Sequence, residues 1–137
     1  MQQDINTILE DFSFLTDWQE KYQYIIDLGT RLPPYPENCK NDAHKISGCI
    51  SQVWLTYTKT TVNNENIFSF LIDSDSHMVK GLLAIVVSIY NGKTISEIKN
   101  IDIKDIFKQL QLSENITPQR SNGVISVIKN IHNIVGL

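Results

Sequence analysis

The stretch from Met78 to Tyr90 places the strongest constraint on how this chain folds. Its residues are apolar almost all the way round when they are set on a helix. A helix without a polar face must be covered on all sides by other elements. The continuous apolar run within it, Gly81 to Tyr90, is about half the roughly twenty residues that a membrane span needs. The sequence therefore predicts a central helix inside a globular fold and no membrane association.

Helical patterns precede and follow this stretch. Ile5, Ile8, Leu9 and Phe12 have helical spacing, which predicts a short first helix. Caps or capping pairs mark the starts of the other helices. These signals are Asp17 with Glu20, Asp75 or Ser76, Thr94 with Glu97, Asp102, and Thr117 before Pro118. We expect the second helix to end at Leu32-Pro33-Pro34, the helix after Asp102 to reach about Leu110, and the last helix to carry an apolar face from Val124 to Val135.

Strand patterns lie between the second helix and the central helix. Residues Ile50 to Thr58 alternate, with Val53, Leu55 and Tyr57 on one face. Asn63-Asn64 predicts a turn, and Ile67 to Ile72 a second, antiparallel strand. A third strand is not evident, and Glu37 to Gly48 reads as a polar surface loop. We expect an α+β fold, a small antiparallel sheet flanked by helices, in one domain over residues 1–137.

Composition narrows the class of protein. Apolar residues make up 42% and charged residues 20%, which is typical of a globular chain. The net charge is −3 and the Lys and Arg residues are scattered, so we expect no nucleic-acid partner. The first residues lack the pattern of a secretory signal, so a cytoplasmic location with reduced Cys39 and Cys49 is expected.

Cys49 is the candidate reactive residue. It follows Gly48, and a glycine lets the backbone turn sharply and present a thiol to another molecule. A lone cysteine at a strand edge is more often simply a small apolar residue. Position alone does not overturn that second interpretation.

The segments around Cys49 resemble the SufE family of sulfur-acceptor proteins. The first is Gly48-Cys49-Ile50-Ser51-Gln52-Val53-Trp54-Leu55. Four others follow the family's order along the chain: Asp17-Trp18 with 21–29, Leu32-Pro33, Asp73-Ser74-Asp75 with 79–82, and 117–123. The chain departs from the family pattern at His44, where Asn is frequent, and at Ile50, where Gln is common. The resemblance covers nearly the whole chain.

This resemblance implies a fold and a function. The fold is that of SufE and of the NifU-like and IscU-like scaffold proteins. The function is to take persulfide sulfur onto Cys49 from a desulfurase that uses pyridoxal phosphate (SufS-like or CsdA-like), to stimulate that enzyme, and to deliver the sulfur to a SufBCD-like scaffold complex for iron–sulfur cluster assembly. No cofactor of its own is expected, and the chain is expected to be a monomer or a weak homodimer.

Several residues are expected to support Cys49. Thiolate is the attacking species, so a cation at Arg120 and the N-terminus of the last helix would favour it. His44 is a candidate base or ion partner. The resemblance further implies contact with the desulfurase at the cysteine loop and the following turn, through Gly48, Ser51, Gln52, Asp73 and Asp75. We expect Cys49 to be sheltered until a partner docks.

Three alternatives remain open from the residues alone. Cys39, His44, Cys49 and His77 are possible ligands of a metal-binding or cluster scaffold, although their spacing matches no common zinc pattern. Cys49 with His44 is the minimal pair of a cysteine hydrolase, but no oxyanion hole is evident. An interaction module with an inert Cys49 is the third, and Cys39 is treated as incidental.

Overall fold

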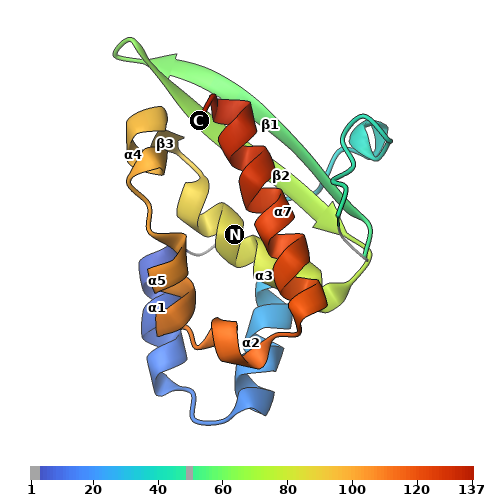
Figure 1. Cartoon of the computed structure of the whole chain (residues 1–137), viewed down its shortest axis with the longest axis vertical. Helices are drawn as coiled ribbons and strands as arrows, with labels where there is room; N and C mark the ends of the chain where they lie inside the picture. Colours follow the sequence, from blue (N-terminus) through green and yellow to red (C-terminus); the bar gives the residue numbers. More distant parts are fainter. Residues whose placement is uncertain (1–3, 49–50) are drawn as a thin grey trace.

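The computed structural model describes residues 4–48 and 51–137 and shows helices gathered around α3, with a small antiparallel sheet packed against them (Figure 1). Within this part of the chain the strand order is β1-β2-β3, formed by Val53–Val62, Glu65–Ser74 and Lys93–Thr94. The helices are α1 (Ile5–Phe14), α2 (Trp18–Thr30), the 3-10 turn η1 (Glu37–Cys39), α3 (His77–Tyr90), α4 (Ile95–Lys99), α5 (Ile103–Gln109), α6 (Leu112–Asn115) and α7 (Pro118–Val135). The predicted α+β class is confirmed.

Helix α3 forms the centre of the molecule, as its apolar sequence predicts. It packs against α1, α2, α7 and β2, and its residues from Gly81 to Val87 are all buried. Its contact with α2 is closest where Gly81 meets Ile25 and Gly29. A Cβ atom on Gly81 would collide with the carbonyl oxygen of Ile25, and one on Gly29 would come within 2.9 Å of the backbone nitrogen of Gly81. The two helix backbones therefore touch without intervening side chains.

The helix starts follow the predicted capping residues. Asp17, Ser76, Asp102 and Thr117 each accept a hydrogen bond from a backbone N–H in the first turn of their helix. The Thr94 capping box forms completely, with Glu97 bonding back to the cap backbone. These bonds satisfy backbone donors that a helix start otherwise leaves unpaired.

The strands differ from the prediction at their ends. β1 begins at Val53, because Ser51 forms a bend and Gln52 is not part of the strand, and it extends to Val62. Ile50, where the strand was predicted to begin, lies outside the described residues. β2 is also longer than predicted, and β3 pairs with it through only two positions, Thr94 and Lys93. A two-residue strand such as β3 is too short to show an alternation of apolar and polar residues, and the four-residue helix α6 is too short to show a helical period. The sequence therefore revealed neither β3 nor α6.

The segment from Glu37 to Gly48 is more ordered than the predicted loop. It contains η1 and then folds back on the start of β1. The backbone N–H of Ile46 donates to the carbonyl of Val53 at 2.8 Å, and that of Leu55 donates to His44 at 2.9 Å. Among the described residues, no helix combines the length and apolarity required to cross a bilayer.

Candidate functional site

Cys49 and Ile50 lie outside the described residues, but the structure describes both ends of the loop that contains them. The backbone bond between Ile46 and Val53 closes this loop, and the bond between His44 and Leu55 continues the pairing below it. The chain from 47 to 52 therefore connects two antiparallel paired segments.

Gly48 forms one anchor of the loop. Its φ of +86° lies in the left-handed region, which glycine adopts without the strain that other residues pay. A Cβ atom at this position would also come within 2.8 Å of the hydroxyl oxygen of Ser126 on α7. The predicted sharp turn at Gly48 is present, and it packs against the last helix.

Asp75 forms the other anchor. The backbone N–H of Gln52 donates to Asp75 Oδ1 at 3.0 Å, and the N–H of Asp75 donates to the carbonyl of Gln52 at 3.3 Å. The expectation that Asp75 lies beside the cysteine loop therefore agrees with the structure. These two bonds connect the end of the loop to the start of α3.

Asp73 holds a neighbouring part of the structure together. Its carboxylate lies 2.8 Å from Lys40 Nζ and 3.2 Å from Lys80 Nζ, and its side chain is only 13% exposed. Burial alone would raise its pKa, but the hydrogen bonds from Lys40, Lys80 and the Ser74 backbone outweigh burial and hold the pKa below its usual value. The ion pairs fasten the chain after η1 to β2 and α3.

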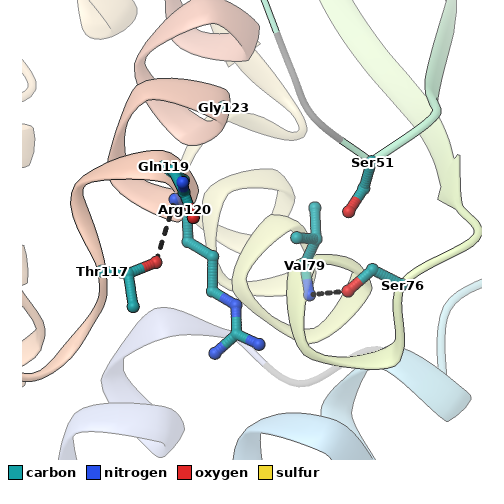
Figure 2. Close-up of a pocket in the computed structure, with 7 residues that line it drawn as sticks. All are labelled: Ser51, Ser76, Val79, Thr117, Gln119, Arg120 and Gly123. Atoms are coloured by element: carbon teal, nitrogen blue, oxygen red, sulfur yellow. Dashed lines mark hydrogen bonds between the residues drawn. The ribbon is translucent and has the colours of Figure 1, made fainter.

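A cavity of about 280 Å³ adjoins the end of the loop (Figure 2). The residues that line it come from the loop, from the start of α3 and from the start of α7: Ser51, Ser76, Val79, Thr117, Gln119, Arg120 and Gly123. Ser76 and Thr117 are the N-caps of α3 and α7, so two helix N-termini meet here. Figure 2 shows the Arg120 side chain extending from α7 into the space between the two helices.

The electrostatic character of this cavity favours an anion. Each helix N-terminus carries a partial positive charge, and Arg120 adds a full one. No acidic side chain belongs to the lining formed by the described residues. The sequence identified Arg120 and the start of α7 as parts of the site. It did not identify the start of α3 as a part of the site. Both caps were visible in the sequence, but their meeting depends on how α3 and α7 pack.

His44 lies apart from this cavity. Its Nδ1 is 2.8 Å from Asn41 Oδ1, and it lines a different hollow with Leu55, Asn130 and Ile134. The structure therefore groups Ser51 with Arg120 and leaves His44 elsewhere. Its expected role as a base or ion partner for Cys49 stays a prediction, since the cysteine is not described.

The residues of the metal hypothesis are only partly described. Cys39 is half-buried and its carbonyl accepts a hydrogen bond from the Tyr35 hydroxyl, while His77 is exposed at the first position of α3. No group of three or more His, Cys, Asp or Glu residues in the described ranges is placed to hold a metal ion. The hypothesis includes Cys49, so it stays untested.

Comparison with known proteins agrees with this picture. The family model described as SufE, an Fe–S metabolism associated domain, matches residues 6–135. An uncharacterised SufE-like protein of Rhizobium etli is 47% identical over 93% of this chain and 86% of its own length. Another, from Rhizobium meliloti, is 42% identical over 93% of this chain and 91% of its own length.

A solved structure shares the fold. It is the solution structure of a hypothetical protein from Thermus thermophilus, with a TM-score of 0.71 over 96% of this chain and 92% of that one, at 15% identity. At that identity the likeness concerns the fold alone. Through the family model and its two relatives, the chain belongs to the SufE family, a membership that supports a sulfur-transfer role in iron–sulfur metabolism.

Proposed function

We propose that Cys49 accepts sulfur from the persulfide of a cysteine desulfurase that uses pyridoxal phosphate, and passes it to a scaffold complex that assembles iron–sulfur clusters. The Cys49 thiolate attacks the outer sulfur of the donor persulfide. The bond between the two donor sulfurs breaks, and its electron pair leaves with the donor cysteine as a thiolate. Cys49 then carries the persulfide, and no external oxidant or reductant is required.

The cavity beside Ser51 is the observation that carries this proposal. Ser51 follows Cys49 by only two residues, and the cavity that Ser51 lines combines Arg120 with the N-termini of α3 and α7. A free cysteine has a pKa of about 8.5, so only a small fraction is thiolate at neutral pH. A nearby cation and helix N-termini lower that pKa, and they also stabilise the terminal sulfur of a persulfide anion.

The anchoring of the loop supports the same function. Gly48 packs on α7, and Gln52 is bonded to Asp75 at the start of α3. The two ends of the loop are thus fixed to the two helices whose N-termini form the cavity. We infer that a docking desulfurase approaches this face and that the cysteine reaches its persulfide without unfolding the paired segments.

The direct test is the mass of the intact protein after incubation with a cysteine desulfurase, pyridoxal phosphate and cysteine. We expect a gain of one or more sulfur atoms in the full chain and in Cys39→Ser, and none in Cys49→Ser. Desulfurase turnover should rise with the full chain and not with Cys49→Ser. Sulfur on Cys39 instead of Cys49, or unchanged turnover with a sulfur-loaded chain, would contradict the proposal in part; no sulfur at all would overturn it.

A further inference from the structure

A second hollow lies on the opposite side of α7 from the cavity beside Ser51. It occupies about 670 Å³ and is formed by α5, the end of α6 and α7. Its lining is mainly apolar and includes Ile103, Phe107, Ile116, Val124, Ile125 and Ile128. Helix α6, the short orange segment between α5 and α7 in Figure 1, joins these two helices, and its Ser113 belongs to the lining.

Exposed apolar surface marks this groove as incomplete. Ile125 is 47% exposed although it lies beside buried Val124. Exposing a large apolar side chain to water is unfavourable, and contiguous apolar patches on monomers often mark binding surfaces. The groove therefore offers area that a partner would bury.

The charges at the groove have one sign. Lys104 and Lys129 belong to its lining, and the lining contains no acidic residue. The ion pairs found among the described residues involve neither lysine. The whole chain has a net charge of −3, so the positive charge of Lys104 and Lys129 is opposite in sign to that of the protein as a whole. Such a pattern attracts an acidic partner.

One buried polar atom in the groove also lacks a partner. His132 belongs to the lining, and its Nε2 is buried without a hydrogen-bond partner in the part of the chain that the structure describes. Its ring packs edge-on against Tyr90 at 5.9 Å, which fixes its orientation. Buried ring nitrogens are normally hydrogen-bonded, so this one marks a wall of the groove whose polar groups are not fully paired.

From these observations we propose that the groove binds an acidic amphipathic helix of a partner protein. Three helices form the groove, so it presents no open strand edge for an extended peptide to pair with. A helix satisfies its own backbone and presents apolar residues at i, i+3, i+4 and i+7 to such a groove. Acidic residues on its flanks would face Lys104 and Lys129. This proposal does not depend on sulfur transfer at Cys49.

The groove is small compared with a stable protein interface, so the contact is weak and transient. We expect a dissociation constant of about 10–100 µM at low salt. Salt should weaken binding, because exposed charges are screened.

The test is an NMR titration of the isotope-labelled full chain with a synthetic helical peptide. The peptide carries leucine at i, i+3, i+4 and i+7 and glutamate on its flanks, and a matched peptide replaces each glutamate with lysine. We expect saturable shifts centred on Phe107, Ile125 and Ile128 with the acidic peptide, and binding at least about tenfold weaker with the basic one.

Variants of the chain distinguish specific binding in the groove from nonspecific binding of the peptide. Ile125→Glu should weaken acidic-peptide binding at least about tenfold. Val62→Glu is the matched control, because Val62 is 48% exposed and lies at the far end of β1. It should leave binding unchanged. Lys129→Glu, at an exposed position, should weaken binding even where Ile125→Glu disturbs folding.

Four results would overturn the proposal. They are an absence of saturable shifts at the groove, equal binding of the two peptides, equal binding by Ile125→Glu and Val62→Glu, and a concentration-dependent dimer that Ile125→Glu abolishes. The last result would assign the groove to a second copy of this chain.

Discussion

Replacing Gly48 with alanine tests whether the loop before Cys49 requires a left-handed residue packed on α7. A non-glycine residue in the left-handed region costs about 1–2 kcal/mol. The new Cβ atom would approach the Ser126 hydroxyl oxygen at 2.8 Å, and moving that side chain away costs about 0.5–1.5 kcal/mol. Alanine returns about 0.4–1 kcal/mol by restricting the unfolded chain. The expected net loss of folding free energy is about 0.5–3 kcal/mol, with a central value of about 2 kcal/mol.

Gly92→Ala provides the matched control. Gly92 also has a left-handed φ, +71°, but a Cβ atom there would meet nothing within 4 Å. This variant therefore carries the backbone strain without the contact, and it should cost about 1 kcal/mol less than Gly48→Ala. Adding Ser126→Ala to Gly48→Ala should recover only the contact part of the loss.

Urea unfolding followed by tryptophan fluorescence measures these differences. The rate of sulfur transfer to Cys49 provides a second measurement, because small displacements of a reacting group can cost up to about a hundredfold in rate. We expect Gly48→Ala to slow transfer at least about tenfold and Gly92→Ala to leave it unchanged. Gly48 has no special requirement for glycine if Gly48→Ala matches Gly92→Ala in stability and the wild type in rate, or if Ser126→Ala restores stability completely.

Three further predictions concern packing, the ion pairs and the cavity. Gly81→Ala forces a methyl group against the Ile25 carbonyl and should cost about 3 kcal/mol in urea unfolding; a loss below about 1 kcal/mol would contradict the contact. Asp73→Asn should cost about 1–2 kcal/mol at pH 7. The Asp73 pKa is held below 3.8, so the stabilisation by the ion pairs is complete at neutral pH and is lost as the pH falls through the lowered pKa. A difference in stability between Asp73→Asn and the wild type that persists in strong acid would refute this role of Asp73. In a Cys39→Ser background, Arg120→Gln should move the midpoint pH of Cys49 alkylation upward and Arg120→Lys should move it less, whereas equal midpoints would remove Arg120 from the proposed function.

Local signals in the sequence predicted most of the helices and the first two strands. Apolar periodicity revealed α3, and side-chain caps located the starts of α2, α4, α5 and α7. These signals act within one turn of helix, so a single sequence carries them directly. β3 and α6 were missed because their few residues carry no period, and their positions depend on β2 and on the neighbouring helices.

The candidate site was predictable only in part. The motif around Cys49 and the cation at Arg120 were visible in the sequence, and so was the turn at Gly48. The meeting of two helix N-termini beside Ser51 was not, since it arises from the packing of α3 against α7. The ion pair that joins Lys40 to Asp73 also connects residues that are distant in the chain, and charge patterns do not reveal such pairs.

The contact between Gly29 and Gly81 has a consequence for the cavity at the start of α3. Where two backbones touch, neither helix can slide or roll without a collision, so the axial position of α3 is fixed at Gly81. Ser76 and Val79, which line the cavity, are within five residues of that point on the same rigid rod. Two positions without side chains therefore determine where the positive end of α3 stands relative to the loop between Gly48 and Ser51.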